Sequence, residues 1–270
     1  MVEKFLEGKG ALITGGASGF GRGVAEAFAE RGADLVLVDI KTDLLEETSS
    51  NIEKKYGCKV VPIECDVSKS DQVKAMAKRT FNELDNIYFL FDNAGIAPGY
   101  RKDFMKLEED LYDLTMNVNL KGQWLVAKEI CKKMRRQQFE PYAGKVVLTA
   151  SMFGVIANEK SFAYSLSKAG AITMAKMLAK TLAPKITVNS ISPGYHVTGI
   201  YHNSLDTLMS VHNDGKAQTP LNRIGDVDDV VKVILFIASD ASNFITGHNF
   251  VIDGGISEVG VPANALKVDL

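Results

Sequence analysis

Seven short apolar segments recur along the chain, with helix-like stretches between them. They occupy residues 10–14, 35–39, 59–63, 87–91, 145–149, 186–191 and 249–252. Largely apolar strands separated by helices of about ten residues or more are typical of a parallel sheet that is covered on both faces. We therefore expect an α/β protein: one doubly wound, Rossmann-type domain with a seven-stranded, mostly parallel sheet and helices on both faces. In such a sheet, ligands bind at the carboxyl ends of the strands, near the point where the strand order reverses.

Length and composition fit one domain. The 270 residues are 46% hydrophobic and contain no linker rich in proline, serine or glycine, so we expect a single domain over 1–270, with 256–270 as a C-terminal tail. A net charge of −2 gives no basic surface for nucleic acid or for an anionic membrane. No apolar stretch is long enough to span a bilayer, and the start does not resemble a secretory signal. We therefore expect a cytoplasmic protein with no nucleic-acid or membrane partner.

The three cysteines carry no sign of a metal site. Cys58, Cys65 and Cys131 are odd in number and lack the spacing of metal ligands. Such cysteines are typical of reduced, structural thiols. We expect no bound metal.

A glycine-rich turn follows the first predicted strand and precedes a helix-like segment over 21–31. Gly15, Gly19 and Gly21 keep the backbone free of side chains, so that its amides and the helix N-terminus can approach a pyrophosphate. Ser18 and Phe20 lie within the same turn. Glycine clusters also mark ordinary turns, but here a second strand follows at the distance expected for a dinucleotide-binding unit. The turn is therefore interpreted as a cradle for a dinucleotide.

An acidic residue ends the second predicted strand. A carboxylate at Asp39, followed by Ile40, can accept hydrogen bonds from the adenosine ribose and repel a 2′-phosphate, which favours NAD over NADP. No residue between Gly15 and Gly19 is basic, so no cation is present in that turn to bind a phosphate. The alternative is that Asp39 only caps the turn before the helix that begins near Asp43.

Tyr164 and Lys168 are four residues apart, which on a helix places both side chains on one face. An adjacent ammonium and an oxidised nicotinamide both favour the phenolate of a tyrosine, which could then accept a proton from an alcohol. Ser151, at the end of the fifth predicted strand, is placed to hydrogen-bond the same substrate oxygen. Asn119 lies inside a long predicted helix, where asparagine is disfavoured unless it has a function. Its alternative is a solvent-facing polar position.

Turn-forming residues also follow the other predicted strands. Any one of these groups could be turn chemistry alone, but their joint occurrence at one sheet edge indicates a ligand site. The groups are Asp66 and Val67 after the third strand, Asn93, Ala94 and Gly95 after the fourth, and Pro193 and Gly194 after the sixth.

Over residues 6–255 these motifs together resemble the short-chain dehydrogenase/reductase family, in its compact single-domain branch. The resemblance implies a catalytic tetrad of Asn119, Ser151, Tyr164 and Lys168, with Lys168 also holding the nicotinamide ribose. It implies that Asp66 and Val67 meet the adenine, that Asn93, Ala94 and Gly95 line the adenosine side, and that Pro193, Gly194 and Thr198 lie against the nicotinamide end. It also implies a homotetramer built on paired long helices, here predicted over 107–138 and 161–183.

Two positions depart from the family pattern. Asp92 stands where the family usually has the first asparagine of Asn-Asn-Ala-Gly. His196 stands where a small aliphatic residue usually presents its backbone to the nicotinamide carboxamide. A backbone contact survives that change, whereas the imidazole either touches substrate or packs at the surface.

The combined prediction is an NAD-dependent oxidoreductase that interconverts a secondary alcohol and a ketone, with Tyr164 as general acid/base. The expected substrate contacts mix apolar and polar groups, namely Phe153, Asn158, Tyr195 and Tyr201, which suits a polyol, a sugar or a cyclic alcohol. A hydroxysteroid or another apolar ketone is the alternative substrate, and a catalytically silent NAD sensor is a further alternative. A sugar-nucleotide epimerase would need a larger C-terminal substrate domain. Residues 260–270 are apolar enough to pack across a neighbouring subunit, although a frayed end is the alternative.

Overall fold

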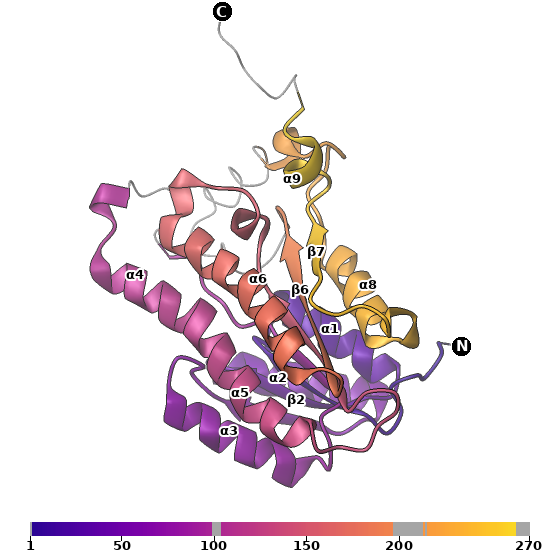
Figure 1. Ribbon diagram of the computed structural model, residues 1–270. Coiled ribbons are helices and arrows are strands. Elements are labelled where there is room, and N and C mark those ends of the chain that lie inside the picture. Colours follow the sequence, from indigo (N-terminus) through magenta and orange to yellow (C-terminus); the bar gives the residue numbers. More distant parts are fainter. Residues whose placement is uncertain (1, 99–103, 197–212, 214, 263–270) are drawn as a thin grey trace, which may run out of the picture.

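The computed structural model describes residues 2–98, 104–196, 213 and 215–262 (Figure 1). Its seven strands form one sheet in the order β3-β2-β1-β4-β5-β6-β7, and each neighbouring pair is parallel. This confirms the predicted doubly wound α/β fold. The strands are β1 (Gly10–Thr14), β2 (Asp34–Asp39), β3 (Val60–Glu64), β4 (Phe89–Asp92), β5 (Gly144–Thr149), β6 (Ile186–Pro193) and β7 (Asn249–Ile252).

Helices cover both faces of the sheet because successive residues of each strand point to opposite sides. Leu12 and Leu90 pack into the core beneath α3 (Ser70–Glu83), α5 (Gln123–Met134) and α6 (Phe162–Leu182). Ile13 and Phe91 pack into the second core, beneath α1 (Gly19–Glu30), α2 (Thr42–Tyr56) and α8 (Val227–Ala238). Figure 1 shows α3, α5 and α6 on one side of the strands, and α1 and α8 on the other.

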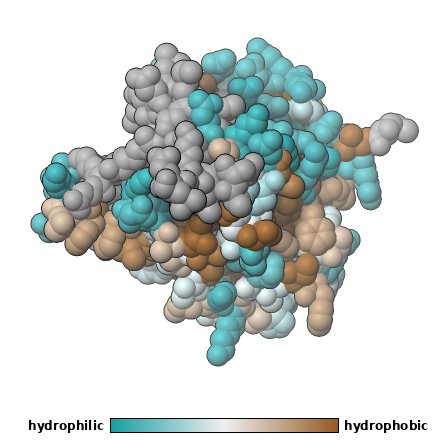
Figure 2. Space-filling view, turned by 90° about the horizontal axis from the view of Figure 1, so that it is seen from above, coloured by the Kyte–Doolittle hydropathy of each residue, from teal (hydrophilic) through white to brown (hydrophobic). Residues whose placement is uncertain are grey.

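The strand order reverses between β1 and β4. The chain winds outward from β1 to β3, then returns to the centre at β4 and winds outward again to β7. The segments after β1 and β4 therefore meet at the carboxyl edge of the sheet, where a ligand crevice is expected. Figure 2 looks onto this edge and shows hydrophobic and hydrophilic residues side by side, with residues of uncertain placement in grey.

The predicted helix over 107–138 is wrong as a single α-helix. The segment consists of α4 (Glu109–Met116), a π-helical turn, η2 (Asn117–Gly122), and α5, which ends at Met134. A π-helical turn inserts one extra residue into the helical ladder and is frequent at functional sites. The helix predicted over 161–183 is confirmed as α6, apart from one residue at each end.

Short elements complete the described part of the chain. They are the 3₁₀ turns η1 (Phe104–Lys106), η3 (Met152–Gly154), η4 (Glu159–Ser161) and η6 (Asp240–Ser242), and the one-turn helix α9 (Ile256–Val259). No described helix combines the length and the apolar character needed to cross a lipid bilayer.

Candidate active site

The glycine turn after β1 leaves no room for side chains. Gly15 and Gly19 adopt φ angles of +67° and +54°, in the left-handed region that glycine tolerates best. A Cβ on Gly21 would overlap the carbonyl oxygen of Gly15, so the first turn of α1 packs directly on the loop. The side chain of Ser18 makes no capping hydrogen bond, and the first turn of α1 contains no acidic residue. An N-terminus of this kind suits a phosphate, so the residues present fit the pyrophosphate of a dinucleotide.

Asp39 joins β2 to this turn. Its Oδ2 accepts a hydrogen bond from the backbone N–H of Ala17 at 3.2 Å, and its Oδ1 accepts from those of Ile40 and Lys41 at 2.8 and 3.1 Å. Asp39 therefore also caps the turn before α2, as the alternative interpretation of this residue expected. Ile40 is 62% exposed beside it. The carboxylate is half-buried at the sheet edge, next to the predicted cradle.

Thr14 joins β1 to the segment after β4, a role that sequence reasoning missed. Its hydroxyl donates to Asp92 Oδ1 at 3.0 Å and accepts from the backbone N–H groups of Asn93 and Ala94. The side chain of Asn93 donates to the Thr14 carbonyl and accepts from the Thr149 hydroxyl. Asn93 therefore ties three strands together, and its backbone shapes the loop predicted to line the adenosine.

Asp66, in the turn after β3, accepts hydrogen bonds from a neighbouring residue of the same turn. Asp66 Oδ1 accepts from the backbone N–H and from the hydroxyl of Ser68, at 2.9 and 2.7 Å. Val67 is buried, and a Cβ on Gly122 would stand only 2.9 Å from its side chain. The pair predicted to meet the adenine is thus held against the π-helical turn η2.

Lys168 lies under the sheet edge, on the same face of α6 as Tyr164. Its ammonium donates to the carbonyl of Thr149 at 2.8 Å and lies 5.6 Å from the centre of the Tyr164 ring. Burial lowers the pKa of Lys168 to about 8, although the nearby Asp92 carboxyl opposes that shift. The spacing of four residues therefore places the two side chains together as predicted.

The pKa of Tyr164 moves in the direction opposite to the expected one. Burial raises the pKa of the phenol above its ordinary value, and a hydrogen bond with the Ser151 side chain only partly offsets this. The reason is that desolvation disfavours the phenolate. Any contribution from a positively charged nicotinamide remains a prediction.

Asn119 is fully buried rather than solvent-facing. Its Oδ1 accepts from the backbone N–H of Ile96, and its Nδ2 donates to the carbonyl of Ile96, both at 2.9 Å. Nδ2 also lies 3.2 Å from the hydroxyl of Ser167. A Cβ on Gly95 would stand 3.3 Å from both Asn119 Oδ1 and Lys168 Nζ, so these two members of the predicted tetrad flank one glycine.

Ser151 follows β5 and begins η3. Its hydroxyl accepts from the backbone N–H of Phe153 at 3.2 Å. Phe153 packs edge-on against Tyr195, with ring centroids 6.0 Å apart. Tyr164 contacts the same apolar cluster, which therefore forms one wall beside the phenol.

The remaining predicted substrate contacts are only partly described. The side-chain oxygen of Asn158 accepts from the backbone N–H of Lys160, so it caps η4. The hydroxyl of Tyr195 lies 3.4 Å from Gln218 Oε1. Thr198 and Tyr201 lie outside the described residues.

His196 lies inside the molecule, where its ring packs on other protein groups. A Cβ on Gly194 would come within 2.7 Å of Asp253, and the Gly194 carbonyl lies 3.1 Å from His196 Nδ1. The ring is edge-on to Phe20, 5.3 Å between centroids, and packs against Gly225. Burial lowers the pKa of His196, which favours the neutral imidazole. The His196 ring therefore packs against other protein groups, as one alternative expected, but it does so in the interior and not at the surface.

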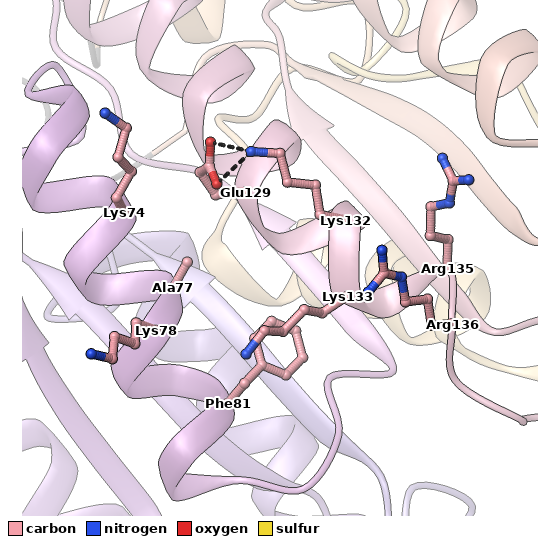
Figure 3. Close-up of a pocket in the computed structure, with 9 residues that line it drawn as sticks. All are labelled: Lys74, Ala77, Lys78, Phe81, Glu129, Lys132, Lys133, Arg135 and Arg136. Carbon is pink, nitrogen blue, oxygen red and sulfur yellow. Dashed lines mark hydrogen bonds and ion pairs between the residues drawn. The ribbon is translucent and has the colours of Figure 1, made fainter.

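Two grooves lie apart from the predicted tetrad. A groove of 510 Å³ between α3 and α5 is lined mainly by lysine and arginine side chains, among them Lys78, Lys133 and Arg136 (Figure 3). A groove of 370 Å³ beside His196 includes Arg223 and Asp253. Within the described residues, no group of three or more histidine, cysteine or acidic side chains could hold a metal ion.

Sequence comparison identifies relatives over almost the whole chain. The family model described as enoyl-(acyl carrier protein) reductase matches residues 15–257. The chain is 35% identical to the 3-oxoacyl-[acyl-carrier-protein] reductase FabG of Thermotoga maritima, over 93% of this chain and 98% of that protein. It is 37% identical to tropinone reductase-like 1 of Erythroxylum coca, with 95% and 93% covered. It is 35% identical to the NAD-dependent glycerol dehydrogenase of Listeria innocua, with 92% and 93% covered.

Solved structures give the same result. A short-chain type dehydrogenase/reductase from Mycobacterium marinum superposes with a TM-score of 0.85 at 34% identity, over 93% of this chain and 96% of that chain. NAD⁺-bound xylitol dehydrogenase superposes with a TM-score of 0.83 at 29% identity, over 93% and 100%.

Proposed function

Because the chain belongs to the short-chain dehydrogenase/reductase family of oxidoreductases, we propose that it is an NAD-dependent enzyme that interconverts a secondary alcohol and a ketone by hydride transfer. The observation that carries the proposal is the arrangement at the carboxyl edge of the sheet. There, Lys168 and Asn119 flank Gly95, the Lys168 ammonium lies 5.6 Å from the Tyr164 ring, and the Ser151 side chain is close enough to the phenol to lower its pKa. The glycine cradle after β1 opens on the same edge.

NAD, when bound, supplies the hydride acceptor or donor. The chain's own groups would bind and orient the reactants: the amides at Gly19 and Gly21 would hold the pyrophosphate, and Lys168 would hold the nicotinamide ribose. Tyr164 takes the proton from the alcohol oxygen, and Ser151 hydrogen-bonds that oxygen. Asn119 holds the loop at Ile96 through two hydrogen bonds.

The proton transfer depends on positive charge near Tyr164. Burial raises the pKa of the phenol, so the protein alone holds it protonated at neutral pH. A cation near a phenol favours its ionised form, and the Lys168 ammonium lies 5.6 Å from the ring. Proton transfer by a positioned side chain of this kind contributes about 10²–10⁴ in rate.

Asp39 supports NAD over NADP. Its carboxylate lies at the end of β2, bound to the glycine turn through Ala17, where a negative charge would repel a 2′-phosphate. A relative named as an NAD-dependent glycerol dehydrogenase and a neighbour named as NAD⁺-bound xylitol dehydrogenase support this cofactor.

A polyol, a sugar or a cyclic alcohol is the proposed substrate class. The names of the same two proteins support a polyol, since glycerol and xylitol both carry secondary alcohols. The apolar wall of Phe153 and Tyr195 suits the carbon face of such a substrate. Asn158 and Tyr201 remain the predicted polar contacts.

We also propose a homotetramer that acts in the cytoplasm, with no nucleic-acid or membrane partner. Apolar side chains on the outer helices support the assembly, because Trp124 is 45% exposed on α5, and Leu166 and Met177 are 45% and 65% exposed on α6. Exposed apolar side chains of this size often mark contacts between subunits. Val126 and Ile130 lie on the same helix as Trp124 but are buried in the core, so they do not contribute to this exposed surface.

Turnover of Tyr164→Phe tests the proposal. The variant lacks only the hydroxyl, so with NAD and a panel of polyols its kcat should fall by at least about 10², while NAD should still bind in a fluorescence titration. Lys168→Met should be at least as damaging, because it removes both the charge and the ribose contact. Near wild-type turnover of Tyr164→Phe would show that another group moves the proton. Failure of the wild type to turn over any alcohol, despite NAD binding, would instead favour the NAD sensor.

A further inference from the structure

Asp92, which departs from the family pattern, is almost completely buried at the end of β4. It is 1% exposed, and among the described residues it makes no ion pair. Its Oδ1 accepts one hydrogen bond, from the Thr14 hydroxyl at 3.0 Å, and its Oδ2 has no donor. An ionised carboxylate has about four acceptor positions and is costly to bury without donors. One hydrogen bond is far from enough for a charged group here.

A second orphaned acceptor lies in the same network. Gln123 Nε2 donates to the carbonyls of Asp92 and Thr149, both at 3.0 Å, while Gln123 Oε1 is buried without a donor. The Thr149 carbonyl also accepts from the Lys168 ammonium. The network around Asp92 therefore has two unsatisfied acceptors and lacks a donor.

We propose that Asp92 is an un-ionised carboxylic acid in the folded protein, a neutral positioning residue that carries its proton on Oδ2 and leaves the charge of Lys168 uncompensated. A protonated acid offers a carbonyl acceptor beside an O–H donor, which resembles the carbonyl and N–H groups of an asparagine side chain, although the asparagine amide has two N–H donors. Asp92 thus replaces the family's usual asparagine by mimicking its hydrogen bonding. In this form it binds Thr14 and adds no negative charge beneath the ammonium that faces Tyr164.

The charges around Asp92 agree with this assignment. Burial raises the pKa of Asp92 well above its ordinary value, and the Thr14 hydrogen bond and the Lys168 charge offset only part of that shift. Cys131 on α5 also faces this region, and burial, with a smaller effect of Asp92, raises its pKa to about 12. The Cys131 thiol therefore stays neutral, and Lys168 is the titratable cation facing Asp92 in the described residues.

The unfolding equilibrium tests the assignment without any use of activity. Between pH 5 and 7 the unfolded chain has released the Asp92 proton, whereas the folded chain still holds it, so wild-type stability falls relative to that of Asp92→Asn as pH rises. The ratio of the two unfolding constants should change about tenfold per pH unit. Lys168 is present in both proteins, and a neutral side chain faces it in each, so its contribution to the two unfolding constants cancels in the ratio.

Urea titrations of cofactor-free wild type and Asp92→Asn at pH 5, 6 and 7 measure this ratio. Asp71→Asn, at a solvent-exposed acid on α3, is the control and should give the same ratio at each pH. If the ratio of the unfolding constants of wild type and Asp92→Asn did not change from pH 5 to 7, the proposal would be overturned, because Asp92 would then be ionised in the folded protein over this pH range. If Asp92→Asn does not fold, Asp92→Ser removes the same titrating group and is compared in the same way.

The link to catalysis rests on the proposed function and has its own readout. If Asp92 is neutral, the midpoint of the acid limb in the pH profile of kcat should be the same for wild type and Asp92→Asn. Removal of a negative charge would instead favour the Tyr164 phenolate and move that midpoint to lower pH. A moved midpoint would refute the uncompensated Lys168, whereas a protein without turnover would refute the proposed function and leave the stability result standing.

Discussion

Replacement of Asn119 by alanine should destabilise the protein by removing the bridge between η2 and the loop after β4. The substitution deprives the Ile96 N–H and carbonyl of their partners. An orphaned buried group costs about 1–3 kcal/mol. Ile96 is only half-buried, so water can reach it and the lower end applies to each group. The expected loss is about 2 kcal/mol, which in a chain of this size lowers Tm by about 4–8 °C.

Thermal unfolding of Asn119→Ala and Ser167→Ala, at one protein concentration and scan rate, measures the difference. Ser167→Ala is the comparison variant, because it leaves both hydrogen bonds to Ile96 in place. It removes the third contact of Asn119 Nδ2, at 3.2 Å, and the hydrogen bond that the Ser167 hydroxyl donates to the Tyr164 carbonyl at 2.7 Å. Its Tm should fall by less than that of Asn119→Ala. The KM for NAD should also rise in Asn119→Ala, because Ile96 directly follows the loop predicted to line the adenosine. Equal Tm values for Asn119→Ala and wild type would refute this reasoning.

Three further outcomes are expected. Gly21→Ala should abolish NAD binding in a fluorescence titration, because its Cβ would overlap the glycine turn; retained affinity would contradict the proposed cradle. Asp39→Ala combined with Ile40→Arg should raise kcat/KM with NADP relative to NAD, because a repulsive charge is lost and a phosphate partner is gained; equal use of both cofactors by the wild type would refute the role of Asp39. Trp124→Glu with Met177→Glu should dissociate the proposed tetramer in sedimentation velocity, because each places a charge on an exposed apolar surface; an unchanged sedimentation coefficient would exclude that surface as the contact.

Hydrophobic periodicity and residue spacing were sufficient to predict the strands, the glycine turn and the helix that carries Tyr164. The apolar runs predicted all seven strands to within two residues at each end, because a fully buried parallel strand must be apolar along most of its length. Gly21 was recognisable because close backbone packing excludes every other residue there. The spacing of Tyr164 and Lys168 predicted one helical face, and α6 places both side chains on it.

Tertiary contacts decided what local periodicity could not. The helix predicted over 107–138 contains the turn η2, and the partner that occupies Asn119 lies 23 residues away, at Ile96. Gln123 lies four residues after Asn119, so a helix over this segment places both polar side chains on one face. That spacing was the one sequence feature that could have indicated a buried hydrogen-bond network there. Thr14 is the first residue of the glycine motif, but its role could not be predicted, because its hydrogen-bond partner Asp92 is 78 residues distant in the sequence.

The sequence by itself therefore determined the sheet, the glycine turn and the Tyr164–Lys168 pair, since helix and strand periods act over neighbouring residues. Only the tertiary structure decided the charge environment of that pair. Burial raises the pKa of Tyr164, lowers that of Lys168 to about 8, and leaves Asp92 with one hydrogen bond. Desolvation depends on what packs around a group from every side, and distant segments meet there only when the sheet has formed.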